Sequence, residues 1–162
     1  MLDSIMDGLK GQLTSTIAEK TGLDLGQAEQ AVPVAKDSIS EGITSAISGG
    51  NVSGILGMLQ GAAGGDAAGL VQNTVYKGIA GNFINGLVSK LGIPESMAST
   101  VSSVALPFIM SKIGNQAKAE GDTDDIDQSS VMSALGLDAG GLLGKAGDLL
   151  GGGGGGLGGM FK

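Results

Sequence analysis

The chain has 162 residues, a formal net charge of −7 and 32 Gly, but only three Phe, one Tyr and no Trp, Cys or His. Without His and Cys there is no imidazole acid–base catalysis, no thiol nucleophile, no disulfide and no zinc or iron–sulfur site of the usual kind. The basic residues are all Lys, and an acidic chain without Arg is not expected to bind nucleic acid.

An amphipathic helix is predicted at the start of the chain, because apolar residues recur three or four positions apart. Gly22 is expected to end this helix, since glycine adopts the left-handed conformation that commonly follows a last helical turn. Asp24 and Gln27 have the spacing of a capping box, so a second helix is predicted to begin there. The apolar stripe of the first helix consists of Leu2, Met6, Leu9, Leu13 and Ile17.

This passage returns further along the chain, because residues 17–43 match residues 87–113 at an offset of 92 − 22 = 70 residues. Repeated helical units stack because neither unit buries its apolar face alone. We therefore predict a duplicated helical domain at residues 1–118, with copies at about 2–48 and 66–116. The identical pairs are Lys20/Lys90, Gly22/Gly92, Ala28/Ala98, Val34/Val104, Ala35/Ala105, Ile39/Ile109 and Ile43/Ile113.

The corner between two helices is predicted in the second copy as well, with Gly92 ending one helix and Pro94 at the first helical position of the next. A proline follows each corner, Pro33 in the first copy and Pro107 in the second. Each is expected to kink its helix or to divide it, because proline lacks the amide proton and clashes with the preceding turn.

A short helix at residues 52–60, between flexible joints, is predicted to connect the copies. Glycines follow at four-residue spacing from Gly57 to Gly69, a pattern that resembles a helix-dimerisation face in membranes, but the short helix is the favoured interpretation. Asp66 is expected to cap one long helix, on which Gly78, Gly81 and Gly86 allow neighbouring helices to approach closely. The apolar stripe of that helix is Val71, Val75, Ile79, Phe83, Leu87 and Leu91.

Residues 119–162 differ in composition and are predicted to form an acidic linker, two short amphipathic helices and a Gly-rich tail. Three aspartates, Asp122, Asp124 and Asp127, suggest a calcium loop, but such a loop needs Gly at position 6 and Glu at position 12. The chain has Asp127 and Ser133 there, so a calcium site is not predicted. Nucleotide binding is not predicted either, since no strand precedes the Gly run and no Lys-Ser/Thr follows it.

Two passages, KTGLDLGQAEQAVPVAKDSISEGI and LVSKLGIPESMASTVSSVALPFIMSKIG, together with the Gly/Leu-rich end, resemble the bacterial YidB-like domain of unknown function. The resemblance implies an all-helical bacterial protein without an established activity, and it carries no catalytic residues. Lys36 and Asp37 depart from the pattern, since apolar residues are expected at those positions of the first copy.

The leading hypothesis is a non-enzymatic structural protein that self-associates as a homo-oligomer, with an ordered polymer as the extended form of that idea. The first alternative is a peripheral protein of the cell envelope or membrane surface that uses its amphipathic helices. An enzyme is the least favoured class. The pairs Ser89-Lys90 and Ser111-Lys112 offer a nucleophile and a base, but adjacent helical residues do not face each other.

No catalytic, cofactor-binding or metal-binding residue is predicted, and no small-molecule substrate is identified. The first residues are acidic and amphipathic, unlike a secretory signal, and the apolar runs are interrupted, for instance by Pro107. A cytoplasmic location is the default expectation, with association at the envelope left open.

Overall fold

The computed structural model describes residues 2–120, and this part of the chain consists of helices joined by short connections. The predicted all-α fold with two related helix-turn-helix units is therefore confirmed. The expectations for the linker, short helices and tail fall outside the described residues, except that the last helix extends through Glu120. The helices are α1 (Leu2–Thr21), α2 (Leu25–Ser48), α3 (Val52–Gly64), α4 (Ala67–Gln72), α5 (Thr74–Leu91) and α6 (Glu95–Glu120).

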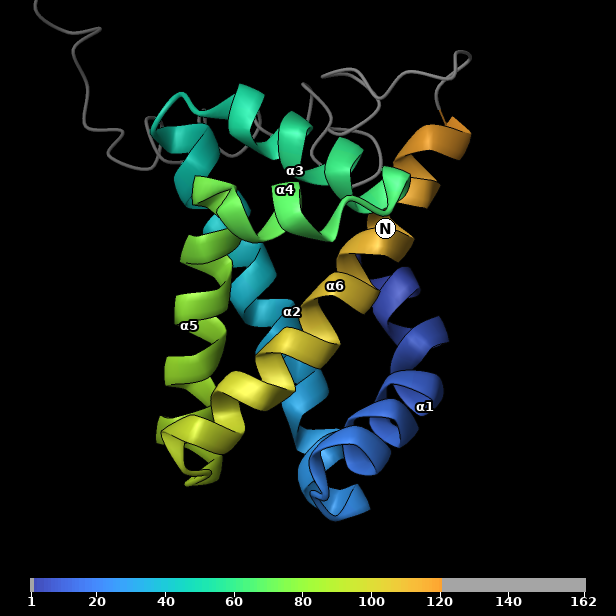
Figure 1. Cartoon of the computed structure of the whole chain (residues 1–162), viewed down its shortest axis with the longest axis vertical. Helices are drawn as coiled ribbons and strands as arrows, with labels where there is room; N and C mark the ends of the chain where they lie inside the picture. The colour runs from blue at the N-terminus through green and yellow to red at the C-terminus, as the bar shows by residue number, and fades with distance from the viewer. Residues whose placement is uncertain (1, 121–162) are drawn as a thin grey trace, which may run out of the picture.

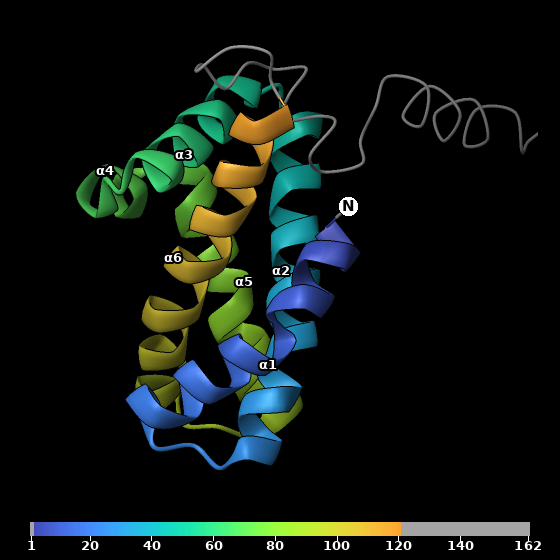
Figure 2. The ribbon, with the colours of Figure 1, turned by 90° about the vertical axis from the view of Figure 1, so that its right-hand side faces the viewer.

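The two helix pairs, α1–α2 and α5–α6, are interlocked in one bundle. Helices α1 and α5 lie on opposite sides, while α6 crosses in front of them and α2 behind (Figure 1). Each of α1 and α5 packs against the second helix of its own pair and against that of the other pair. This is an approximate two-fold arrangement, in which α1 corresponds to α5 and α2 to α6. Helices α3 and α4 lie across one end of the bundle (Figure 2).

The core repeats in the same register as the sequence. The buried residues of α1 are Met6, Leu9, Leu13 and Ile17, and a shift of 70 residues leads to Tyr76, Ile79, Phe83 and Leu87, which are the buried residues at the same positions of α5. The repeat thus extends to the first helix of each unit, where the identity between the copies is too low to show it. Both copies bury the same stripe because both meet the same pair of second helices.

The two corners use the predicted glycines. Gly22 and Gly92 have φ of +74° and +65°, so each ends its helix in the left-handed conformation that a side chain would disfavour. Asp24 caps α2, because its Oδ1 accepts a hydrogen bond of 2.9 Å from the Gln27 amide. Pro94 lies one residue earlier than predicted, at the cap of α6, where its carbonyl accepts from the Ala98 amide at 2.9 Å.

Neither proline divides its helix. Pro33 lies inside α2 and Pro107 inside α6, and both helices continue past them, for 24 and 26 residues in total. Pro33 is exposed and Pro107 half-buried. Proline costs a helix one hydrogen bond, and the tertiary packing of these long helices outweighs that loss.

The predicted long helix after Asp66 is two helices. Asp66 caps only α4. Asn73 separates α4 from α5, because its backbone is extended, with φ of −65° and ψ of +131°. The Asn73 Oδ1 accepts from the amides of Val75 and Tyr76 at 2.9 and 3.3 Å, and its Nδ2 donates to the Gly54 carbonyl at 2.9 Å. Because of this break, the stripe begins at Val75 and Val71 is 49% exposed.

The connecting helix α3 is longer than predicted and its ends are capped. It runs to Gly64 instead of residue 60, with Asn51 at its N-terminal cap and Gly65 at its C-terminal cap. The glycines at four-residue spacing do not form a common face. Gly65 takes the left-handed conformation, and the Gly69 amide donates to Asp66 at 2.9 Å. The interpretation as a short helix is therefore confirmed.

Glycines allow several helices to approach closely, and only one of the three glycines predicted for this role has it. A Cβ atom at Gly86 would lie 2.6 Å from Val34 Cγ1, as expected for a tight contact with α2, whereas Gly78 and Gly81 have nothing within 4 Å. The expectation of a close contact was therefore wrong for these two. Two glycines that were not singled out have the same role as Gly86: Gly42 against Ile79, and Gly114 against the Leu59 carbonyl.

Helix α3 covers only one of the two equivalent long helices. It packs along α6, where a stripe of buried residues lies on the same face as Gly114. These residues are Leu106, Met110, Gly114 and Ala117, whereas the same positions of α2 carry Lys36, Ser40, Thr44 and Ile47. The first copy therefore departs from an apolar pattern at Lys36 because α3 has no counterpart over α2 among the described residues.

Candidate interaction surfaces

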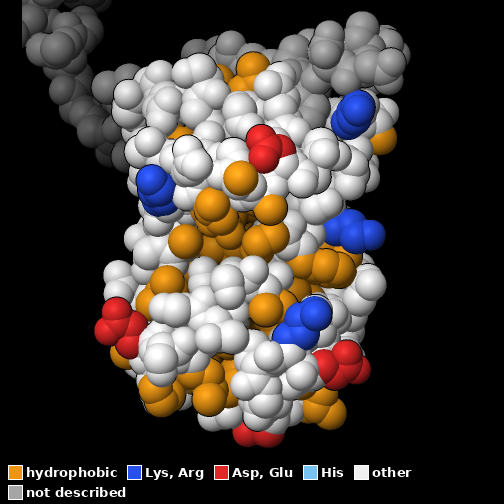
Figure 3. All heavy atoms as spheres, in the orientation of Figure 1, with side chains coloured by type: hydrophobic (Ala, Val, Ile, Leu, Met, Phe, Trp, Pro, Cys, Tyr) orange, Lys and Arg blue, Asp and Glu red, His pale blue; other side chains and the backbone are white. Residues whose placement is uncertain are grey.

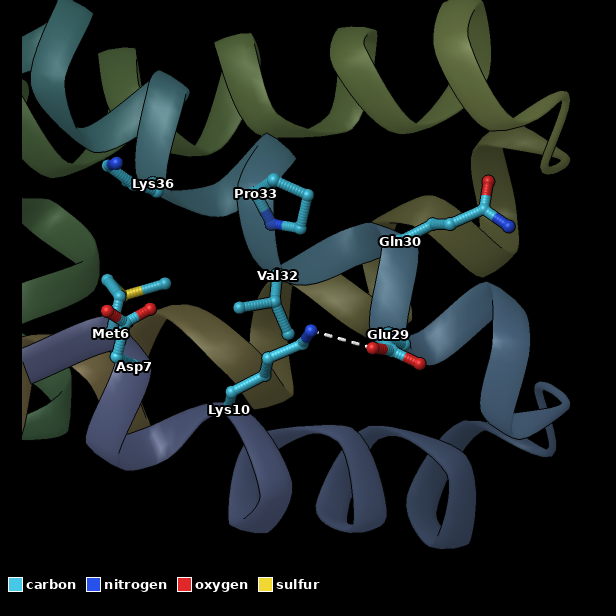
Figure 4. Close-up of a pocket in the computed structure, with 8 residues that line it drawn as sticks. All are labelled: Met6, Asp7, Lys10, Glu29, Gln30, Val32, Pro33 and Lys36. Atoms are coloured by element: carbon cyan, nitrogen blue, oxygen red, sulfur yellow. Dashed lines mark ion pairs between the residues drawn. The ribbon is translucent and has the colours of Figure 1, made fainter. Parts of the chain in front are cut away.

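The seam between α1 and α2 holds a charged pocket of about 400 Å³ (Figure 4). Lys10 Nζ lies 2.7 Å from Glu29 Oε1 across the pocket, and Lys36 pairs with Asp3 beside it. Apolar atoms come from Met6, Val32 and Pro33, and the remaining lining residues are Asp7 and Gln30.

The ion pairs across this seam fix the charges of their members. Hydrogen bonding to Lys10 lowers the pKa of Glu29, and hydrogen bonding to Glu29 raises the pKa of Lys10. Hydrogen bonding likewise lowers the pKa of Asp3 and raises the pKa of Lys36. Both pairs therefore favour the charged forms of their lysines and carboxylates.

In the equivalent seam between α5 and α6, Ala80 and Ser99 replace the ion-paired Lys10 and Glu29. Four residues of α5 form a second stripe beside its buried one, and we call this stripe the α5 face: Ala80, Ile84, Val88 and Leu91. Val88 is 39% exposed and the other three are half-buried. Apolar side chains gather in the region bounded by α4, α5 and α6 (Figure 3).

The α5 face differs from the equivalent positions of α1. Those positions are occupied by Lys10, Thr14, Ala18 and Thr21, in a helix that packs in the equivalent place. On α5, Ala80, Ile84 and Leu91 pack against the core, and Val88 is exposed. A comparison of the sequence at an offset of 70 residues contains this difference between α1 and α5. The difference can be recognised only once the structure shows which stripe of α5 is buried.

The serine–lysine pairs do not form a site. Ser89 Oγ donates to the Asn85 carbonyl at 2.7 Å, and Lys90 Nζ lies 3.6 Å from Asp37 Oδ2 on α2. The Lys112 ammonium lies 6.0 Å from the centre of the Phe108 ring. Each lysine therefore faces a partner other than its neighbouring serine.

Tyr76 and the carboxylates are the other residues whose side chains could take part in chemistry. Tyr76 is buried, and burial raises the pKa of its hydroxyl. Within residues 2–120, no three acidic side chains lie close enough together to hold a metal ion. Asp37, unexpected in the sequence pattern, links the two helix pairs through Lys90.

One helix in the described range, α6, is long and apolar enough to cross a membrane by length and composition alone. The apolar window, Glu95–Ala119, has a mean hydropathy of 1.2 and includes Pro107, which was expected to interrupt it. Half of this window is buried in the protein, where α6 packs against α1, α3 and α5.

A family model described as bacterial protein of unknown function (DUF937) matches the chain twice, at residues 3–74 and 73–159. The matches begin 73 − 3 = 70 residues apart, the offset of the repeat, and the second begins at the break between α4 and α5. The resemblance noted in the sequence and the internal repeat are thereby confirmed. Neither the curated proteins nor the solved structures contain a match to this chain.

Proposed function

Because the chain belongs to a bacterial family of unknown function, DUF937, we propose its role from its surface: a non-enzymatic helical module that associates with further copies of itself. The α5 face carries this proposal. It presents Ala80, Ile84 and Leu91 where α1 carries polar residues, and it exposes Val88 where α1 has the smaller Ala18. Exposed apolar residues grouped on one side of a helix are typical of contacts with a partner.

The kind of partner follows from the chemistry of the α5 face. Its four side chains are aliphatic and uncharged, and the open glycines Gly78 and Gly81 leave the neighbouring helix surface thin. A surface of this kind packs against another aliphatic helix, and a second α5 face is such a surface. Two copies related by a two-fold axis would bury both faces in one self-complementary contact. Further contacts at the other end of the molecule would extend the dimer into a polymer.

The test is the mass of the full-length protein in solution, measured by size-exclusion chromatography with light scattering over a range of concentrations. We expect the wild-type protein to form dimers or larger assemblies. Val88→Glu should shift the protein to the monomer, because a carboxylate in an apolar contact would lose its hydration.

Leu25→Glu is the matched control, since Leu25 is 63% exposed at the start of α2, outside the α5 face. This variant should assemble like the wild-type protein. A wild-type protein that stays monomeric at high concentration would refute self-association. If the Val88→Glu variant assembles as well as the control, association uses a different surface.

The membrane-surface alternative is tested on the same proteins. It draws support from the apolar composition of α6, but Lys20, Lys77, Lys112 and Lys118 are few cations for binding to anionic lipid. We expect the wild-type protein to remain in the supernatant after sedimentation with vesicles of anionic phospholipid. Pelleting of the wild-type protein with vesicles, in conditions where the protein alone does not pellet, would favour the membrane role.

A further inference from the structure

The two contacts between the helix pairs should be alike in a symmetric bundle, but they differ in how closely the helices approach. Helix α5 meets α2 through glycines: Gly42 faces Ile79, and a Cβ at Gly86 would lie 2.6 Å from Val34 Cγ1. The corresponding contact is that of α1 with α6, where the same positions are Lys112 and Thr16. Side chains at these two positions keep α1 and α6 further apart than α5 and α2.

A groove of about 590 Å³ lies between α1 and α6, and a smaller one of about 300 Å³ lies at the equivalent place between α5 and α2. The larger groove is lined by Ser4, Ile5, Gly8 and Leu9 of α1 and by Lys112 and Gln116 of α6. We call this the α1–α6 groove.

Side chains beside the groove are less buried than their counterparts in the other contact. Val34 of α2 is 6% exposed, whereas the equivalent Val104 of α6 is half-buried, as is Phe108. A Cβ at Gly8 would have no atom within 4 Å, so the wall at α1 is open. The groove is a mainly apolar depression with a lysine at its edge.

The chain continues from the end of this groove. Gln116 lines it and α6 ends at Glu120, which is four residues or about 6 Å further along the axis. The next ten residues, 121–130, span up to about 33 Å when extended, which is long enough to turn back over the groove. They lead to residues 131–137, whose sequence VMSALGL is the first apolar stretch after α6.

The charges are complementary. Asp122, Asp124, Asp125 and Asp127 precede the apolar stretch. On the last turns of α6, Lys112 and Lys118 are exposed, and neither forms an ion pair with a carboxylate of residues 2–120. A short tether also makes the local concentration of the stretch high compared with that of any free partner.

From these observations we propose that residues 131–137 of the same chain dock in the α1–α6 groove. The apolar side chains of this stretch cover Ile5, Leu9 and Phe108, while the aspartates before it face Lys112 and Lys118. The docked stretch covers the larger of the two grooves, and it leaves the α5 face free.

Paramagnetic broadening in NMR spectra of the full chain tests the proposal, because the natural sequence has no Cys and takes a single spin label. Ser133→Cys places the label in the docking stretch, and Gly155→Cys, in the Gly run, is the matched control. We expect the label at 133 to cause loss of the amide signals of residues 4–9 and 112–116, and the label at 155 to leave them. Leu135→Glu in the chain labelled at 133 should restore the signals, since the stretch loses its apolar contact.

A mixed sample identifies which chain occupies the groove. It combines isotope-labelled protein without spin label and spin-labelled protein without isotope label. We expect no broadening in this mixture, because the docking is intramolecular. Broadening at the groove in the mixture would show that a second copy supplies the stretch and would overturn the proposal. Absence of broadening at the groove in the chain labelled at 133 would overturn it too.

Discussion

At the scale of the residue, a glycine inside a helix has opposite effects depending on what lies beside it. Gly114 faces the backbone of α3, where a Cβ atom would come within 2.7 Å of the Leu59 carbonyl and 3.1 Å of the Ala63 Cβ. Gly81 faces open space. A backbone neighbour cannot rotate away as a flexible side chain does, so the first position requires glycine and the second only tolerates it.

We predict opposite changes in stability for alanine at these two positions. Gly114→Ala should lower the free energy of unfolding by about 1–3 kcal/mol, because α3 must move away from α6. Gly81→Ala should raise it by up to about 1 kcal/mol, since alanine has the higher helix propensity. Urea unfolding followed by circular dichroism measures both. Equal effects of the two substitutions would contradict the close contact at Gly114.

At the scale of the element, Asn73 has two roles that one side chain performs together. Its carboxamide oxygen caps α5 through the amides of Val75 and Tyr76, and its nitrogen holds the Gly54 carbonyl on α3. The break between α4 and α5 is therefore tied to the helix that covers α6. The cap fixes the start of α5 and with it which apolar stripe is buried.

Asn73→Ala should destabilise the protein by about 1–2 kcal/mol, as expected for the loss of a helix cap. Asn73→Ser should cost less, because serine is also a good cap, although it is too short to keep the bond to Gly54. Asn85→Ala, at an exposed position of α5, is the control and should change stability by no more than about 0.5 kcal/mol. Thermal unfolding of the three variants ranks their stabilities. An Asn73→Ala variant as stable as the control would contradict the capping role.

The helices and their corners could be predicted from the sequence because both depend on local chemistry. The apolar period identifies α1 and the buried face of α5, and Gly22, Asp24 and Gly92 carry their own turn and cap signals. The break at Asn73 has only the capping preference of Asn as a signal, and the apolar spacing that continues through Val71 outweighs it. It depends on a bond to Gly54, 19 residues away.

Tertiary features could not be predicted, because a residue's neighbours decide them. Gly78, Gly81 and Gly86 look alike in the sequence, but only Gly86 contacts another helix. The same holds for the surfaces: the α5 face and the buried stripe of α5 have the same period, and only the packing separates them. The sequence shows the duplication, but it does not show which helix packs against each helix face.

At the scale of the whole molecule, the two copies of the duplicated unit have corresponding core positions but different surface residues. The core positions correspond at an offset of 70 residues, but the seam of the first copy has Lys10 and Glu29 where the second has Ala80 and Ser99. Helix α3 packs mainly against α6 and much less against α2. A two-fold bundle thus presents a seam with an ion pair on one side and a seam without this ion pair, beside the α5 face, on the other, which makes the two surfaces suited to different contacts.

The unequal seams predict that stability depends on protein concentration. Assembly through the α5 face occurs only between folded chains, so it stabilises the folded state by mass action. Each tenfold rise in concentration above the dissociation constant should add up to about 1.4 kcal/mol and raise the midpoint of thermal unfolding by a few degrees. Scanning calorimetry should show this rise for the wild-type protein and for Leu25→Glu, and a constant midpoint for Val88→Glu. A midpoint that is independent of concentration in all three proteins would mean that the α5 face makes no contact between folded chains, and its apolar residues would need another partner.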